Sequence, residues 1–223
     1  MTGVEALYPF LYDRPAGVNG TGLEEVLAQV AHSTERKVAE IDQLREAVAA
    51  EYAVRLADCA VAMAARFAAG GRLMTFGNGG SSTDASAVAA RFLDPGGGAR
   101  PLPAFALTED VATLTALAND VSFEVVFARP LAAAGRAGDI AFGLSTSGGS
   151  ANVLRGLAEA HRLGMLTVGL AGYAGGAMAE AAERGEIDYL FVMPSDSVHR
   201  IQEAQTSTYH VLWELVQCAL ASA

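Results

Sequence analysis

The chain has 223 residues, of which 52% are hydrophobic and 18% charged, and its net charge at pH 7 is −10. A chain with this many apolar residues is expected to fold. A chain with this much negative charge is a poor partner for the phosphate backbone of nucleic acids. No run of residues reaches the roughly 18 apolar residues of a membrane span, and the N-terminus lacks the pattern of a signal peptide. We therefore expect a cytoplasmic protein that binds neither nucleic acid nor membranes.

The N-terminal part of the chain divides into an irregular arm and a long helical region. Residues 1–20 form the predicted arm, in which prolines and glycines interrupt an aromatic stretch. This arm either packs against the chain or makes an exposed contact between subunits. Over residues 23–69, apolar side chains recur at steps of three and four, which is typical of helices. We expect one break in this region, near Ser33 or Ala50.

Short apolar runs alternate with helical patterns after residue 71. Continuous apolar runs separated by helices indicate a parallel sheet that is covered on both faces. The expected strands are Leu73–Phe76, Ala104–Leu107, Ile140–Leu144, Leu166–Leu170 and Tyr189–Met193. The expected helices are Ser82–Leu93, Asp110–Ala118, Glu124–Ala134, Ala151–Leu163, Ala177–Arg184 and Arg200–Ala221. The prediction is one α/β domain over residues 21–223, with a doubly wound five-stranded sheet and extra N-terminal helices.

The two cysteines are far apart in the sequence. Cys59 and Cys218 both lie in apolar helical patterns. We expect both to be buried, reduced thiols rather than a disulfide or a pair of metal ligands.

Two polar loops follow the first and third expected strands. They are residues 76–84, with the sequence FGNGGSSTD, and residues 145–150, with the sequence STSGGS. Open parallel sheets bind ligands beyond the carboxyl ends of their strands, at the point where the strand order reverses. If the strand order is 2-1-3-4-5, that point lies between the first and third strands. The sequence therefore predicts a ligand site where these two loops meet.

The second loop has the composition of a phosphate site. Its hydroxyl groups can donate hydrogen bonds, its glycines let backbone N–H groups approach an anion, and a helix begins near Ala151. The hydroxyls belong to Ser145, Thr146, Ser147 and Ser150. The alternative is a plain turn in which Ser150 caps the helix. Neither loop carries a nucleotide-binding signature.

The C-terminal helix supplies candidate acid–base groups. Glu203 and His210 are seven residues apart, close to two helical turns, so both can share one face of the helix. Gln202 lies eight residues before His210, about 80° around the helix. The alternative is that the histidine only packs. The surrounding polar residues favour a role at a site.

Four separate segments carry a family resemblance. They are FGNGGSSTDA, LTALANDVSFEVVFARPL, GRAGDIAFGLSTSGGSANVLRGL and RIQEAQTSTYH. In this order and spacing they resemble the sugar isomerase (SIS) domain family, and within it the phosphoheptose isomerases, over about residues 36–221. The resemblance implies a five-stranded parallel αβα sandwich. It also implies a cytoplasmic homotetramer that converts sedoheptulose 7-phosphate to D-glycero-D-manno-heptose 7-phosphate.

The resemblance also implies which residues contact a phosphorylated sugar. The serines and the threonine of residues 145–150 would hold the phosphate, and Gln202 and His210 match the family's metal-binding and catalytic pair. Glu203 is a second catalytic candidate from its position on the same helix. The other implied contacts are Asn78, Gly79, Gly80, Ser81, Asn119, Asp120 and Gln202.

Two positions depart from the family pattern. The family has a zinc-binding His at the position of Ala87. It has a Glu, which binds zinc and moves the proton, at the position of Arg91. Alanine has no donor atom, and arginine stays protonated. Zinc normally takes about four ligands, and Gln202 and His210 alone cannot supply them. We predict no metal, no cofactor and poor or absent isomerase activity. Arg91 is expected to bind an anionic part of the ligand, or to pair with Asp84 or Asp94.

These residues leave two functions open. One is a divergent phosphosugar isomerase. The other is a phosphosugar sensor or scaffold without turnover, similar to the SIS protein that associates with the DnaA replication initiator. In both cases we expect a homotetramer or a dimer, because residues 23–69 and 200–221 carry more apolar surface than one sheet can cover. The sequence names no other protein partner.

Overall fold

The computed structural model describes residues 23–222, so the predicted N-terminal arm lies outside the described residues. The first helix, α3, runs from Leu23 to Ala68 without interruption, and the predicted break near Ser33 or Ala50 is wrong. The physical reason is that this segment contains neither glycine nor proline. None of the helices described is long and apolar enough to span a membrane.

The chain divides into two compact units between Glu40 and Ile41. The described part of the first unit, residues 23–40, is helix, in which Arg36 pairs with Glu40 at 3.7 Å. Four of its apolar side chains are exposed, namely Val26, Leu27, Val30 and Val38. Surface ion pairs of this kind contribute little to stability.

The second unit is built on a five-stranded parallel sheet. Its strands are β1 (Leu73–Gly77), β2 (Ala104–Ala106), β3 (Ile140–Ser145), β4 (Leu166–Gly172) and β5 (Tyr189–Met193). The strand order is β2-β1-β3-β4-β5, with Leu73 paired to both Ala104 and Ile140. The predicted α/β fold and strand order are therefore confirmed, and the order reverses between β1 and β3.

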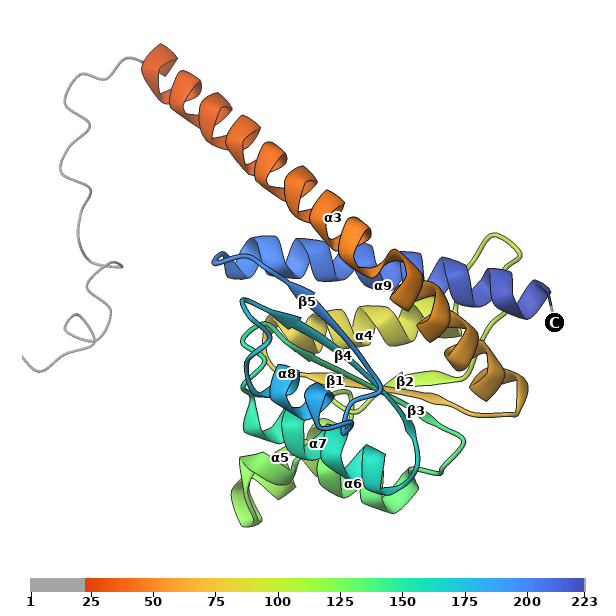
Figure 1. Cartoon of the computed structure of the whole chain (residues 1–223). Coiled ribbons are helices and arrows are strands. Elements are labelled where there is room, and N and C mark those ends of the chain that lie inside the picture. Colours follow the sequence, from red (N-terminus) through yellow and green to blue (C-terminus); the bar gives the residue numbers. More distant parts are fainter. Residues whose placement is uncertain (1–22, 223) are drawn as a thin grey trace, which may run out of the picture. The chain divides into compact units, whose positions relative to one another are not determined.

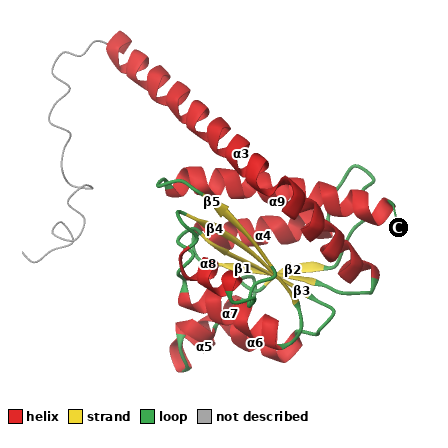
Figure 2. Ribbon diagram, viewed as in Figure 1, coloured by secondary structure: helices red, strands yellow, loops and turns green. Residues whose placement is uncertain are grey.

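Helices cover both faces of this sheet (Figures 1 and 2). Residues 41–68 of α3 pack on one face together with α4 and α9, while α5 to α8 lie on the other. The bounds are α4 (Gly80–Leu93), α5 (Val111–Asp120), α6 (Ala128–Ala134), α7 (Ala151–Arg162), α8 (Gly176–Glu183) and α9 (Val198–Ala221).

Alternate residues of the strands supply two separate hydrophobic cores. Leu73 packs with the α3, α4 and α9 face, whereas Met74 and Phe76 pack with α6, α7 and α8. Successive side chains of a strand point to opposite faces, so both sides of a central strand must be apolar. Each large side chain buried in this way contributes about 1.5–3 kcal/mol.

Two sequence predictions fail locally. The predicted helix over residues 124–134 is a short 3₁₀ turn, Phe123–Val125, followed by α6. Pro130 explains the interruption, because its ring would clash with the carbonyl four residues earlier in a continuous helix. The second failure concerns Cys218, which is exposed. Cys59 is buried as predicted, and burial raises the pKa of its thiol.

Candidate functional site

The loop after β1 turns sharply into α4. Gly77 is required there, because a Cβ at this position would lie 2.6 Å from the Ser81 carbonyl oxygen. Gly79 has a φ of +56°, a left-handed conformation that side chains rarely adopt. The Ser81 N–H donates to the Asn78 carbonyl at 3.0 Å and closes the turn. The predicted sugar contacts Asn78 to Ser81 thus form one compact turn at the carboxyl end of β1.

A pair of asparagines joins this turn to the beginning of α7. The Asn78 Nδ2 donates to Asn152 Oδ1 at 2.8 Å, and the Asn152 Nδ2 donates to Asn78 Oδ1 at 2.9 Å. The Asn152 Oδ1 also accepts the Val153 N–H at 3.0 Å. The Asn78 amide therefore fixes the two loops together, and its predicted contact with a sugar stays a prediction. Sequence reasoning missed Asn152, because a polar residue in the first turn of a helix is ordinary.

The serines of residues 145–150 point toward one another. The Ser145 Oγ lies 3.0 Å from Ser150 Oγ and 3.4 Å from Ser147 Oγ, and the Gly149 N–H donates to Ser147 Oγ at 3.2 Å. Ser150 stands before α7 but its side chain makes no capping hydrogen bond. The plain N-cap alternative is therefore not what the structure adopts. The positive end of the α7 dipole faces this hydroxyl cluster.

A close backbone contact fixes the shape of this loop. Gly148 has a φ of +63°, and a Cβ there would lie 1.9 Å from the Gly175 carbonyl oxygen. The Gly148 carbonyl accepts the Met178 N–H at 2.9 Å. The loop after β3 is therefore held against the beginning of α8, and only glycine fits at its tightest point.

The other candidates lie where α4 meets α9, a region that we name the α4–α9 seam. It comprises Gly80, Asp84, Ala87 and Arg91 of α4 and Gln202, Tyr209, His210 and Trp213 of α9. A Cβ on Gly80 would lie 2.2 Å from Gln202 Nε2, and this Nε2 donates to Asp84 Oδ2 at 3.5 Å. Farther along both helices, Arg91 contacts Trp213. The two helices therefore run in the same direction.

Asp84 is a half-buried carboxylate within the seam. Burial raises its pKa, and the hydrogen bond from Gln202 opposes that shift. Burial also raises the pKa of Tyr209, with a further contribution from the charge of Asp84. No ion pair joins Asp84 to a basic side chain within residues 25–222.

Arg91 is held by an aromatic ring and not by an acid. Its guanidinium carbon lies 3.7 Å from the centre of the Trp213 ring, and its Nη1 donates to the Pro95 carbonyl at 3.4 Å. The alternative of pairing with Asp84 or Asp94 is wrong. A guanidinium stacks well on indole because it is planar and weakly hydrated. The Arg91 Nε and the Trp213 Nε1 are both buried without a hydrogen-bond partner.

The seam does not fit the zinc ion that the family resemblance implies. Ala87 is exposed and has no donor atom, and Arg91 presents a fixed positive charge one turn farther along the helix. In the described part of the chain, no three His, Cys, Asp or Glu side chains are grouped so that they could hold a metal.

The two predicted acid–base candidates, Glu203 and His210, lie on α9. Glu203 forms an ion pair with Arg200 on the same helix. His210 is half-buried, with its ring centre 4.9 Å from that of Tyr209.

The predicted pair on α5 is on the other face of the sheet. The Asn119 Nδ2 donates to Asp120 Oδ1 at 2.6 Å, and both residues are exposed. Because α5 and the α4–α9 seam cover opposite faces (Figure 1), the structure does not bring this pair into the seam.

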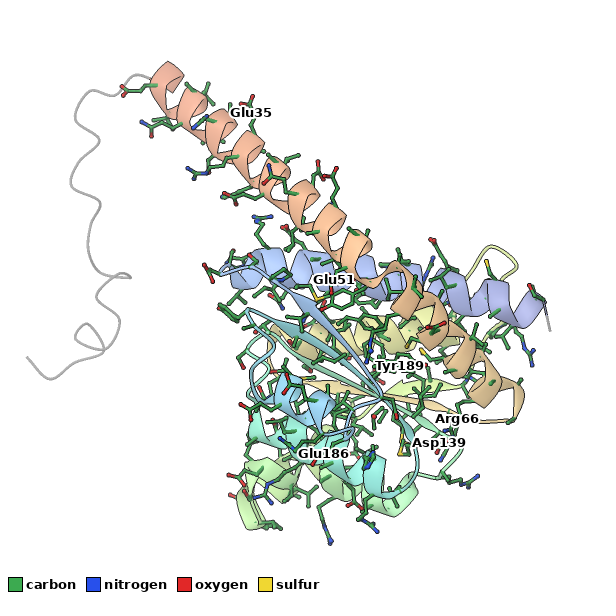
Figure 3. The ribbon with its side chains drawn as sticks, viewed as in Figure 1. Glu35, Glu51, Arg66, Asp139, Glu186 and Tyr189 are labelled. Atoms are coloured by element: carbon green, nitrogen blue, oxygen red, sulfur yellow. The ribbon has the colours of Figure 1, made fainter. Side chains whose placement is uncertain are left out.

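A hydrogen-bonded cluster of charged side chains lies at the edge of the sheet opposite to the loops after β1 and β3, and its role is structural. Asp139 precedes β3 (Figure 3) and is 2% exposed. It accepts hydrogen bonds from the Arg72 backbone N–H at 2.9 Å and from the Arg72 Nη2 at 2.6 Å. Burial raises the pKa of Asp139, but the hydrogen bonds from Arg72 and Arg136 outweigh it and leave the pKa below its usual range. The cluster joins the amino ends of β1 and β3, far from the loops that follow these strands.

Comparisons with known proteins show the family of this chain. The SIS domain family model matches residues 38–172. A phosphoheptose isomerase of Aquifex aeolicus is 44% identical over 170 residues, which cover 74% of this chain and 85% of that protein. Another, from Desulfovibrio desulfuricans, is 45% identical over 174 residues, covering 78% of this chain and 80% of that protein.

Solved structures show the same likeness. The phosphoheptose isomerase from Francisella tularensis superposes with a TM-score of 0.77 and 32% identity, over 86% of this chain and 98% of that one. The phosphoheptose isomerase GmhA from Neisseria gonorrhoeae gives a TM-score of 0.74 and 31% identity, over 86% and 99%.

Proposed function

Because this chain belongs to the SIS domain family, we propose that it binds a phosphorylated sugar where the loops after β1 and β3 meet. The observation that carries the proposal is the arrangement of residues 145–150. Their hydroxyls converge, Ser150 turns away from capping α7, and Gly148 holds the backbone in a fixed curve. Such loops at a helix N-terminus suit a phosphate group.

We propose a heptose phosphate as the ligand, since the similar proteins are named phosphoheptose isomerases. Conversion of an aldose to a ketose removes a proton next to a carbonyl, so it requires a positioned base. Ala87 and Arg91 cannot supply one. His210 is the acid–base candidate that lies in the seam, and Glu203 is already paired with Arg200. We therefore propose that sedoheptulose 7-phosphate binds but is isomerised poorly or not at all.

The second candidate function is a phosphosugar sensor or scaffold without turnover in the cytoplasm. The observation that favours it is the stacking of Arg91 on Trp213, because a structural contact takes up the position of the expected base.

Both functions involve a homotetramer or a dimer. Val54 and Val61 of α3 support this, since they are 76% and 61% exposed. Sedimentation as a monomer at micromolar concentration would contradict it.

The binding proposal is tested by calorimetry with sedoheptulose 7-phosphate. The double variant Ser147→Ala, Ser150→Ala removes two hydroxyls from the loop. We expect each hydroxyl to contribute about 1.5–3 kcal/mol, because it donates to a charged group. Ser222→Ala is the matched control, since its hydroxyl bonds only the Cys218 carbonyl at the end of α9. Unchanged affinity in the double variant would refute the phosphate site.

The catalytic part of the proposal is tested by metal analysis and a coupled isomerase assay. Protein purified without chelator is expected to contain far less than one zinc per chain. Turnover is expected to stay below ~1 s⁻¹, the lower end of typical enzyme rates, and added zinc should not raise it. Stoichiometric zinc, or fast turnover that disappears in His210→Ala, would show that another residue has replaced the missing base.

A further inference from the structure

A strained tyrosine lies in the loop that follows β4, residues 172–176, which we name the β4 loop. Tyr173 has a φ of +51° and is the only residue other than glycine with a positive φ in the part of the chain that the structure describes. L-residues rarely adopt this conformation, because it brings their Cβ close to the following carbonyl oxygen. A glycine at this position would avoid the strain. The presence of a tyrosine therefore calls for a role of its side chain.

Packing inside the chain does not supply that role. Tyr173 is 38% exposed. Within residues 23–222, its hydroxyl makes no hydrogen bond and its ring stacks on no aromatic or cationic group. The backbone is held by its neighbours instead, since the Gly175 N–H donates to the Gly172 carbonyl at 2.8 Å across the turn. Strained residues persist where their surroundings fix them, and they cluster at functional sites.

The β4 loop lies directly beside the proposed phosphate loop. The two loops follow β3 and β4, which are neighbouring parallel strands. A Cβ on Gly172 would lie 2.6 Å from the Thr146 carbonyl oxygen, and a Cβ on Gly176 would lie 2.6 Å from the Ser147 carbonyl oxygen. The loops are therefore in backbone contact on both sides of Tyr173. This places Tyr173 at the rim of the hydroxyl cluster.

A phenol at this rim complements the serine hydroxyls. A phosphate group has three strong acceptor oxygens, and hydrogen bonds to them are strengthened by their charge. The hydroxyl of a tyrosine can donate one more such bond. Its ring is apolar and can keep water away from the anion, which strengthens the other hydrogen bonds around it. Both properties require the whole side chain, which a glycine lacks.

We propose that Tyr173 is a ligand-binding residue whose hydroxyl donates to the phosphate and whose ring covers it. The inference rests on the proposed phosphosugar site and adds the β4 loop to the two loops that form it. The strain at Tyr173 then presents the side chain to the ligand. Removal of this side chain should therefore stabilise the protein and weaken its binding at the same time, which a purely structural role would not do.

Calorimetry and thermal unfolding of two variants test this inference, with sedoheptulose 7-phosphate and inorganic phosphate as probes. Tyr173→Phe keeps the ring and the strain, so it should unfold at the wild-type temperature. It should bind both probes about 10- to 100-fold more weakly, because a hydrogen bond to a charged group is lost. Tyr173→Gly relieves the strain and should unfold about 2–4 °C above the wild-type protein. Its affinity for both probes should be at least as weak as that of Tyr173→Phe.

Ala174→Gly is the matched control, because Ala174 is exposed in the same loop and its φ is not positive. Glycine there only adds conformational freedom to the unfolded chain, so the unfolding temperature should fall. Both affinities should stay at the wild-type value.

The outcomes separate this inference from the proposed function. If the wild-type protein binds neither probe, both fail. If it binds the probes and both Tyr173 variants bind them equally well, only the inference fails. Lower stability of Tyr173→Gly, or its sedimentation as a smaller species than the wild-type protein, would show that the tyrosine packs within the chain or between subunits. Either result would overturn the ligand-binding role.

Discussion

The proposed phosphate loop, residues 145–150, and the α4–α9 seam are held in place by different kinds of contact. Backbone geometry fixes the loop, since Gly148 lies against the Gly175 carbonyl and its own carbonyl accepts the Met178 N–H. Side chains fix the seam, where Arg91 stacks on Trp213 and Gln202 reaches Asp84. A loop that is fixed by its backbone keeps its shape when neighbouring side chains change. In a seam that is fixed by side chains, two substitutions are enough to remove metal-binding and acid–base groups.

This difference explains how the chain resembles an isomerase without its expected metal ligands. The two departures, Ala87 and Arg91, lie on exposed or half-buried positions of α4 and do not disturb the core beneath them. Under the proposed function, binding depends on the loop and catalysis on the seam, so the two are expected to be separable.

The largest expected effect comes from restoring the seam to the family pattern. The double variant Ala87→His, Arg91→Glu adds an imidazole and a carboxylate next to Gln202 and His210, which completes the about four ligands that zinc requires. We expect zinc content near one per chain. Sedoheptulose 7-phosphate isomerisation should rise by about 10²- to 10⁴-fold, the usual contribution of a positioned base.

Arg91→Gln alone is the control for this restoration, because it removes the arginine without adding either ligand. It should gain neither zinc nor activity. If the double variant folds and also gains neither, the seam differs from the family site by more than two residues, and the comparison between loop and seam is wrong.

The sequence predicted the loop better than it predicted the seam. Strand order and the positions of both polar loops follow from apolar runs and glycines, which act through local backbone preference. The stacking of Arg91 on Trp213 joins two helices that are distant in sequence, and a charge pattern along one helix cannot show it. The Asn78–Asn152 pair was missed as well, because a polar residue in the first turn of a helix is ordinary. Cys218 was predicted to be buried, because the apolar pattern of a helix does not show where the elements that pack against that helix end.

A smaller effect is expected from a single methyl group in the loop. Gly148→Ala would place a Cβ 1.9 Å from the Gly175 carbonyl oxygen at a positive φ, so the loop must move. We expect phosphosugar affinity to fall by about 10- to 100-fold, equivalent to the loss of one or two hydrogen bonds to a charged group. Gly149→Ala is the matched control, because its Cβ would meet only the Ser147 Oγ, at 3.8 Å. Equal affinities in the two variants would contradict a backbone-fixed loop.

The smallest expected effect concerns the stability of the seam. A cation–π contact contributes about 0.5–2 kcal/mol. A double-mutant cycle of Arg91→Met and Trp213→Leu, measured by denaturant unfolding, should therefore give a coupling energy of about 1 kcal/mol. Affinity for inorganic phosphate should not change in either variant, because the loop is fixed independently.

Arg55 and Tyr189 provide the matched control for this cycle. The Arg55 guanidinium lies 5.6 Å from the Tyr189 ring centre and is exposed, so its coupling energy should be smaller, about 0.5 kcal/mol or less. A coupling energy near zero for Arg91 and Trp213 would show that the arginine does not stabilise the seam. Arg91 would then be available to contact a ligand, and the seam would bind the ligand together with the loop.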